Sequence, residues 1–212
     1  MVEMASVSAR SLQSSRTLAR LVMSEGPGFL VTWLRLRRTV RGWLATRDAQ
    51  LLHQLARNGP GRGNIVEIGS AYGLSTMVLA DGARRAGRDK VYTIDPHSFY
   101  GSEAEMRANF DRHGMTNWIT AVVSESGPAA KSLKVGPIRL LYIDGLHTYE
   151  GARADIKDWV PKVVPGGIVV FDDYFDERPE IGVRAAVDQL LSTGEVAPDL
   201  NRADHLVWVE KR

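Results

Sequence analysis

Acidic side chains gather in two short segments of the sequence. The segment Tyr142–His147 carries Asp144, and the segment Phe171–Tyr174 carries Asp172 and Asp173. Both segments include the end of an apolar run that is typical of a buried strand. Ligands of open α/β sheets bind beyond the carboxyl ends of the strands, so we expect the three carboxylates to converge. Left unpaired they would repel one another, whereas oxygen ligands suit Mg2+ or Mn2+. The sequence therefore predicts a divalent metal site formed by these three acids.

A histidine follows the first of these acids by three residues. A metal ion would acidify a substrate hydroxyl bound to it, and His147 is a side chain that accepts such a proton at neutral pH. These residue types predict chemistry in which an activated hydroxyl attacks an electrophile. Structural roles would explain the same residues: Asp172 and Asp173 as a helix cap or a solvated loop pair, and His147 as the start of a helix.

A glycine-bearing turn, Glu67–Gly73, lies where a first strand meets its helix. Gly69 lets the chain turn and lets a ligand approach the backbone. The spacing from Gly69 to Gly73 differs from the Gly-x-Gly-x-x-Gly pattern that seats a pyrophosphate. Asp95 closes the second strand, where a carboxylate can accept hydrogen bonds from both ribose hydroxyls. The pattern indicates a nucleoside site without a pyrophosphate; alternatively, these are turn glycines and a surface acid.

The candidate residues need a framework of strands that alternate with helices. From Asn64 onward, short apolar runs recur between segments with helical periodicity. Such strands favour a parallel sheet that is covered on both faces. The pattern predicts an α/β fold: a Rossmann-like, seven-stranded, mostly parallel sheet with helices on both faces. The predicted strands include 65–68, 91–94, 118–123, 138–143, 168–171 and 205–209; the predicted helices include 103–112, 149–160 and 181–191, and a turn is predicted at 165–167.

The first sixty residues differ from the rest and predict a helical extension, residues 1–60, ahead of a domain at 61–212. Trp33, Leu36, Val40 and Trp43 recur at helical spacing with arginines between them. Such helices could lie on an anionic membrane or contact a nucleic-acid backbone. Packing on the core or on a second subunit explains the same pattern, and we favour a lid or a homodimer contact. The serine- and alanine-rich start, residues 1–15, is expected to be mobile.

Composition excludes several classes of site. The chain has 212 residues, a formal net charge of +2 and no cysteine, so disulfides, thiolate metal sites and cysteine nucleophiles are absent. The small net charge does not indicate nucleic acid as a partner. No apolar stretch is long enough for stable membrane insertion, and the start lacks the layout of a signal peptide. We therefore expect a cytoplasmic protein with a small-molecule substrate.

The stretch from Asn64 to Arg212 resembles class I S-adenosylmethionine-dependent methyltransferases. It is most similar to metal-dependent sugar O-methyltransferases of the macrocin and mycinamicin type, and among short relatives to mycobacterial methyltransferases that act on methylmannosides. In that type an aspartate after strand four and an acidic pair after strand five hold magnesium, and a histidine three residues past the first aspartate is the base. The matching residues here are Asp144, Asp172, Asp173 and His147. Catechol O-methyltransferases carry lysine and asparagine where this chain has His147 and Asp173, whereas the macrocin type often has glutamate in place of Asp172. The region before residue 60 has no counterpart in this comparison.

The resemblance implies an enzyme that transfers a methyl group from S-adenosylmethionine to a hydroxyl of a sugar, polyol or glycoside, with Mg2+ (or Mn2+). A catechol-type enzyme acting on an aromatic diol is the alternative. A non-catalytic binding module and a Rossmann dehydrogenase are further alternatives, the latter disfavoured by the glycine spacing. His147 and Asp144 are the expected catalytic residues. The residues expected to bind the methyl donor are Glu67, Gly69, Ser70, Gly73, Ser75, Asp95 and Ser124.

Overall fold

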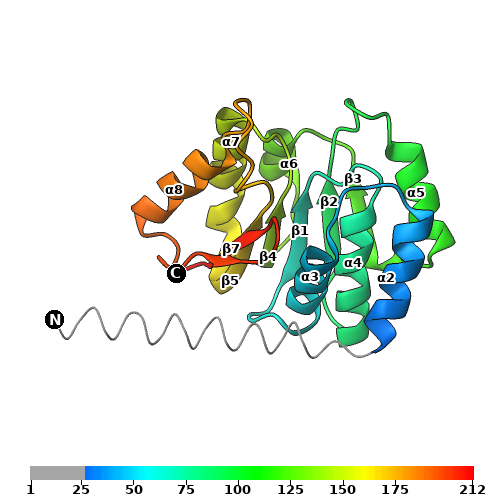
Figure 1. Cartoon of the computed structure of the whole chain (residues 1–212). Coiled ribbons are helices and arrows are strands. Elements are labelled where there is room, and N and C mark those ends of the chain that lie inside the picture. Colours follow the sequence, from blue (N-terminus) through cyan, green and yellow to red (C-terminus); the bar gives the residue numbers. More distant parts are fainter. Residues whose placement is uncertain (1–26) are drawn as a thin grey trace.

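The computed structural model describes residues 27–212, which form one seven-stranded sheet with helices on both faces (Figure 1). The strand order is β3-β2-β1-β4-β5-β7-β6. Strands β1 to β5 pair in parallel, and β7 runs antiparallel to both β5 and β6. The predicted fold class is thereby confirmed. The strands are β1 (Asn64–Ile68), β2 (Val91–Ile94), β3 (Ile119–Val122), β4 (Ile138–Ile143), β5 (Val163–Phe171), β6 (Asn201–Arg202) and β7 (Val207–Glu210).

Two apolar clusters, one on each face of the sheet, hold the helices in place. Successive side chains of a strand point to opposite faces, and β4 follows this rule: Leu140 and Tyr142 join one cluster, Leu141 and Ile143 the other. Every residue of β4 is buried, as expected for a central parallel strand. The first cluster includes residues of α2 (Pro27–Thr39), α3 (Thr46–Asn58), α4 (Leu74–Ala86) and α5 (Glu103–Arg112); the second includes residues of α6 (Ser126–Ser132), α7 (Tyr149–Trp159) and α8 (Val183–Thr193).

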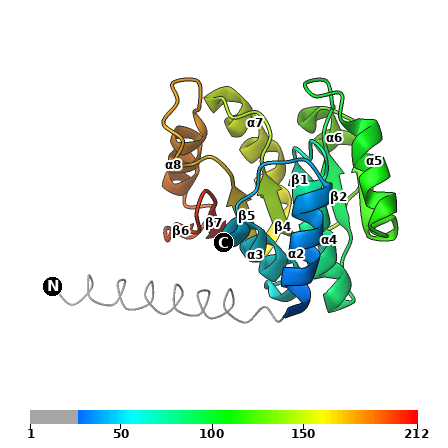
Figure 2. The same cartoon turned by 45° about the vertical axis from the view of Figure 1, so that its right-hand side comes forward.

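The N-terminal helices α2 and α3 pack into the first cluster beside α4 (Figure 2). Trp33 of α2 is buried, and its Nε1 donates a hydrogen bond to Thr46 Oγ1 at 3.2 Å. His53 of α3 pairs at 3.1 Å with Asp81 of α4, and both side chains are fully buried. Helices at residues 27–58 therefore agree with the prediction, while the expectation for residues 1–15 lies outside the described residues. Between residues 27 and 212, no helix combines the length and apolar character needed to cross a membrane.

Trp43 is a correction to the predicted apolar stripe. Helix α2 ends at Thr39, and Gly42 takes a φ of +152°, so the chain leaves the helical path before residue 43. Trp33, Leu36 and Val40 are buried as predicted, whereas Trp43 is 73% exposed. This tryptophan therefore belongs to the surface rather than to the core.

The structure also corrects the C-terminal strands. Strand β5 begins at Val163, ahead of the predicted turn at 165–167. Ile138 pairs with Val163 but Leu140 with Ile168, so the residues between bulge out of the ladder. The last long strand begins at Val207, which leaves His205 in the turn after β6. Neither β6 nor α6 is predicted by the hydrophobic pattern, because each is short.

Candidate functional site

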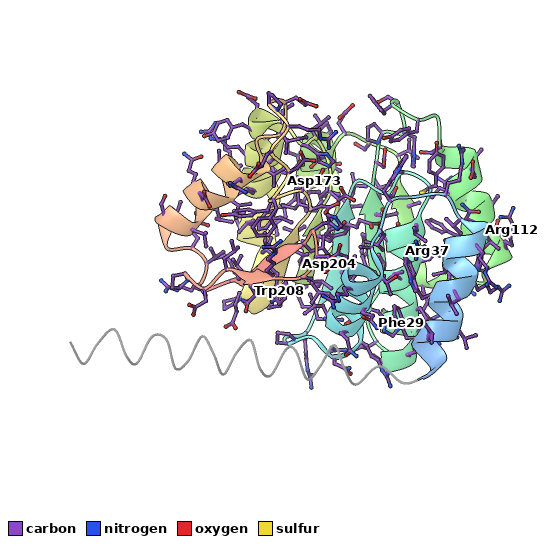
Figure 3. The ribbon with its side chains drawn as sticks, viewed as in Figure 1. Phe29, Arg37, Arg112, Asp173, Asp204 and Trp208 are labelled. Atoms are coloured by element: carbon purple, nitrogen blue, oxygen red, sulfur yellow. The ribbon has the colours of Figure 1, made fainter. Side chains whose placement is uncertain are left out.

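A cavity of about 1030 Å3 lies beyond the carboxyl ends of the parallel strands. Figure 3 shows Asp173 at this edge of the sheet, just past the end of β5. Connections from β1, β2, β4 and β5 line the cavity together with the segment between α2 and α3. The predicted site residues that it brings together are Gly69, Ser70, Ser75, Asp95, Asp144, His147, Asp172 and Asp173.

The acidic cluster is organised around the ring of His147. Its Nε2 lies 3.2 Å from Asp144 Oδ1, and its Nδ1 lies 3.1 Å from Asp173 Oδ2. The phenol of Tyr142 donates a hydrogen bond to Asp144 Oδ2 at 3.1 Å. The histidine therefore bridges the segments that follow β4 and β5.

The helix-terminus explanations for these residues do not hold. Thr148 is the N-cap of α7, where its Oγ1 accepts a hydrogen bond from the Gly151 amide, so His147 lies outside that helix. The next helix after Asp172 and Asp173 is α8, which begins ten residues later at Val183. Asp173 has a φ of +57°, in the left-handed region that is uncommon for residues other than glycine. Such backbone conformations concentrate at functional sites.

Burial and mutual repulsion shape the charges of this cluster. Burial raises the pKa of Asp144, against the stabilising hydrogen bond from His147. Burial, followed by the nearby charges of Asp144 and Asp173, raises the pKa of Asp172 to about 8. The hydrogen bond to Asp144 raises the pKa of His147. The cluster therefore favours an added positive charge, which a protonated histidine or a cation would supply.

The donor set of the cluster fits a hard divalent cation, since it consists of carboxylate oxygens at two neighbouring strand ends. In residues 27–212, however, no three or more histidine, aspartate or glutamate side chains are arranged as a ready set of ligands. The His147 ring lies between Asp144 and Asp173 instead. The chemistry of the cluster suits a metal, while its present geometry is held by the histidine.

The glycine turn packs directly against the acidic cluster. Gly69 has a φ of +88°, and a Cβ at this position would overlap the backbone carbonyl oxygen of Asp144. The amide of Asp144 donates a hydrogen bond to the carbonyl of Ile68 at 2.9 Å, which ties the ends of β1 and β4 together. Only glycine fits this junction, because both the conformation and the space exclude a side chain.

Asp95 shapes the glycine turn. Its Oδ2 accepts hydrogen bonds from the amides of Ser70 at 2.9 Å and Ala71 at 2.8 Å, and its Oδ1 accepts one from His97 at 2.6 Å. A carboxylate offers about four acceptor positions, so one position on Oδ1 stays free for a ligand. The sequence predicts that Asp95 accepts hydrogen bonds from two ribose hydroxyls. In the structure, Asp95 can accept a hydrogen bond from one hydroxyl without losing any of its three bonds to backbone amides.

Three predicted donor-binding residues do not line the cavity. Glu67 is fully buried, and its Oε2 accepts hydrogen bonds from Thr76 at 2.5 Å and Thr93 at 2.7 Å. Its Oε1 receives no hydrogen bond of ordinary geometry from the described residues, and burial raises the pKa of Glu67 to about 7. Gly73, at a φ of +85°, is the N-cap of α4. Ser124 donates to the carbonyl of Glu125, and the neighbouring residues 125–127 line the cavity in its place.

Several cavity residues were not predicted. They include Arg41, Trp43 and Asp48 near the N-terminal helices, Ser98–Tyr100 after β2, Arg178 before α8, and His205 in the β6–β7 turn. They come from separate segments without a shared motif. The exposed aromatic rings of Trp43 and Tyr100 lie 5.7 Å apart at this wall. Aromatic residues in polar loops are the local signal of this wall that the sequence carries.

A family model described as a methyltransferase domain matches residues 66–174, more than half of the chain. The chain belongs to this methyltransferase family. The match begins in β1 and ends at Tyr174, so it contains the glycine turn, Asp95 and the acidic cluster. The predicted relationship to the methyltransferases is thereby confirmed.

The curated relatives align with only part of this chain. Protein R132 of Acanthamoeba polyphaga mimivirus is 30% identical over 132 residues, which cover 60% of this chain and 58% of the relative. Protein y4gI of Sinorhizobium fredii is 28% identical over 116 residues, which cover 51% of this chain and 13% of the relative. The chain thus spans less than two thirds of both relatives.

Solved structures share the whole fold of the methyltransferase. Cofactor-bound Rv0187 from MTB has a TM-score of 0.66 at 23% identity, with 88% of this chain and 91% of that chain covered. The S-adenosylhomocysteine-bound methyltransferase PaMTH1 of Podospora anserina has a TM-score of 0.69 at 15% identity, with 94% and 95% covered. The O-methyltransferase TomG of Streptomyces achromogenes, in complex with S-adenosylmethionine, has a TM-score of 0.66 at 16% identity, with 88% and 91% covered. At these identities the likeness establishes the fold.

Proposed function

We propose that this methyltransferase transfers the methyl group of S-adenosylmethionine to a hydroxyl of a sugar or glycoside, with a divalent metal and with His147 as the base. One observation carries the proposal: three carboxylates and a histidine converge beside a glycine turn on one cavity wall. The solved relatives that hold this donor or its product support the choice of methyl donor.

The donor half of the proposal rests on the glycine turn. Gly69 and Ser70 present backbone beside the cavity, and Asp95 holds this turn while keeping one acceptor position free. We infer that a ribose hydroxyl of the donor takes that position. Ser75 lines the same wall, and Glu125–Gly127 supply further backbone where Ser124 was expected. The donor carries a sulfonium, and transfer of its methyl group turns this sulfonium into a neutral thioether.

The acceptor half rests on the acidic cluster. Asp144, Asp172 and Asp173 would hold Mg2+ or Mn2+, which would bind the acceptor oxygen and acidify its hydroxyl. With Asp144 and Asp173 turned toward the metal, His147 would have a ring nitrogen free to remove the hydroxyl proton; the oxygen then bonds to the methyl carbon, and the carbon–sulfur electrons pass to sulfur. Because His147 lies between two carboxylates, its pKa is raised, and its neutral form predominates only on the alkaline side of its ordinary range. We therefore expect the rate to rise with pH through this group.

A catechol remains the second candidate acceptor, supported by the exposed rings at the cavity wall. Trp43 and Tyr100 would pack on the flat face of an aromatic diol. They would also pack on the apolar face of a sugar ring. His147 at the base position favours the sugar, since the resembling catechol enzymes carry lysine there.

The experiment incubates the protein with S-adenosylmethionine, Mg2+ and a panel of methyl glycosides and catechols, and identifies products by mass spectrometry and NMR. We expect a methylated glycoside, loss of activity with chelator, and recovery with Mg2+. His147→Ala should reduce kcat by about 10²–10⁴-fold and remove the rise with pH. Glu210→Gln, which changes an exposed acid of β7, is the control. Methylation of catechols alone would refute the sugar proposal, and chelator-resistant turnover would refute the metal.

The N-terminal segment is proposed to cover the acceptor side of the cavity. Residues 41–45, between α2 and α3, line the cavity. This position supports a role as a cover rather than as a membrane anchor.

Leu30, Val31 and Leu34 form an exposed apolar patch on α2, and we propose this patch as the homodimer contact. Sedimentation velocity on wild type and Leu34→Glu tests the dimer: a wild-type monomer would refute it.

A further inference from the structure

A second acid–histidine pair lies on the wall of the same cavity, outside the acidic cluster. His205 of the β6–β7 turn and Asp48 of α3 are both cavity residues. His205 Nδ1 lies 2.9 Å from Asp48 Oδ2, and the His205 amide donates to the same carboxylate at 3.2 Å. The proposed methyl transfer uses neither residue.

Strand register brings this pair to the edge of the sheet where the acidic cluster lies. Val207 of β7 pairs antiparallel with Phe171 of β5. His205 lies two residues before Val207, the first residue of β7, and Asp173 lies two residues after Phe171, the last residue of β5. The turn is closed by the Ala203 amide, which donates to the Leu206 carbonyl at 2.9 Å. Both functional segments therefore leave neighbouring strands at the same level.

The turn is also fastened to α3. Arg47 Nη1 lies 3.5 Å from Asp204 Oδ1, and Figure 3 shows Asp204 between β7 and the start of α3. This ion pair sits beside the Asp48–His205 pair, so the turn keeps its position without depending on the histidine alone.

The chemistry of the pair leaves one ring nitrogen for a ligand. Asp48 is 2% exposed at its side chain and lies in the first turn of α3, where the helix dipole favours a negative charge. A carboxylate at Nδ1 selects the tautomer that carries its proton there, which makes Nε2 an acceptor. Nε2 has no partner among residues 27–212, and the His205 side chain is 66% exposed.

We propose that His205 Nε2 accepts a hydrogen bond from a second hydroxyl of the acceptor, and that Asp48 is its positioning residue. The inference rests on the proposed function and narrows it: the acceptor carries at least two hydroxyls, one at His147 and one at His205. A sugar ring and a catechol both meet this requirement, and a simple alcohol does not. His205 thereby selects the acceptor and its orientation.

The competing explanation is that the pair merely fastens the turn, and two substitutions separate the explanations. His205→Asn keeps an amide donor near the Nδ1 position, and so keeps the bond to Asp48, but removes the acceptor at the Nε2 position. His205→Gln places an amide oxygen near Nε2. We expect His205→Asn to raise the acceptor KM by about 10-fold, the scale of one lost hydrogen bond. The donor KM and the Tm should not change, and His205→Gln should recover part of the loss.

The acceptors are methyl glycosides of mannose, glucose and galactose and their monodeoxy analogues, assayed with wild type and both variants. For the glycoside that wild type methylates, one deoxy analogue should lose about 10-fold in kcat/KM on wild type and nothing further on His205→Asn. Equal losses from every deoxy analogue on wild type and variant would overturn the role of His205. Absence of turnover by wild type on every glycoside would instead refute the proposed function, and this inference with it.

Discussion

Glu67 is buried at the centre of the fold. Its substitution by glutamine tests whether the charged form of this side chain lowers the free energy of unfolding. The side chain accepts hydrogen bonds from Thr76 and Thr93 and lies close to Ser75, but no described residue makes a hydrogen bond of ordinary geometry to its Oε1. Burial raises its pKa from 4.5 to about 7. The folded protein therefore holds a proton on Glu67 that the unfolded chain has released between these two pH values.

The sign and size of the effect follow from this difference. The stabilising contribution of the protonated form is fully present below pH 4.5 and is lost as pH rises through about 7. Each pKa unit corresponds to about 1.4 kcal/mol, so the shift from 4.5 to about 7 corresponds to ~3 kcal/mol in total. Glutamine carries no charge at any pH. Relative to wild type, the free energy of unfolding of Glu67→Gln should gain about 2–3 kcal/mol between pH 5 and pH 8.

The assay is urea unfolding of wild type and Glu67→Gln at pH 5, 6, 7 and 8, without ligand. Other titrating groups cancel in the difference between the two proteins. Glu103→Gln on α5, whose side chain is 43% exposed beside Arg107, is the control. Stability curves of wild type and Glu67→Gln that stay parallel across this range would refute the reasoning.

Three further perturbations test the cavity. Asp95→Ala should weaken S-adenosylhomocysteine binding by about 10–100-fold in calorimetry, since charge-assisted hydrogen bonds are lost; undiminished affinity would remove Asp95 from the donor site. Gly69→Ala should lower the free energy of unfolding by at least about 2 kcal/mol, because strain adds to overlap. Gly87→Ala, at a φ of +65° with open space around it, should cost only about 1 kcal/mol, and equal losses would contradict the close approach at Gly69. Mg2+ should raise the Tm of wild type but not of Asp172→Asn; a rise in both would place the metal elsewhere.

Much of the acidic cluster could be predicted from sequence, for a simple reason. Asp144, Asp172 and Asp173 each follow a strand directly, and parallel strands end at one edge of a sheet. His147 follows Asp144 within one short loop. Local spacing and topology together therefore determine that these groups meet, as the distances around His147 bear out.

The rest of the cavity could not be predicted in this way. His205 and Asp48 are far apart in sequence, and they meet because α3 packs against the sheet and β7 pairs with β5. Trp43 followed a helical spacing that continued past residue 39, but α2 ends at Thr39, so the spacing no longer described the backbone at residue 43. Glu67 looked like a ligand-binding acid, yet its position within β1 buries it. Spacing reports contacts within a segment, whereas these outcomes depend on tertiary packing.

The packing of α2 and α3 has a consequence for how fast a substrate can reach the cavity. Both helices contribute to the same apolar cluster as α4, so the segment between them is anchored at each end. The exposed rings of Trp43, within this segment, and of Tyr100 line the cavity, and exposed side chains rotate within picoseconds to nanoseconds. We therefore expect acceptor entry to wait on side-chain rotation rather than on a slower hinge motion of this segment.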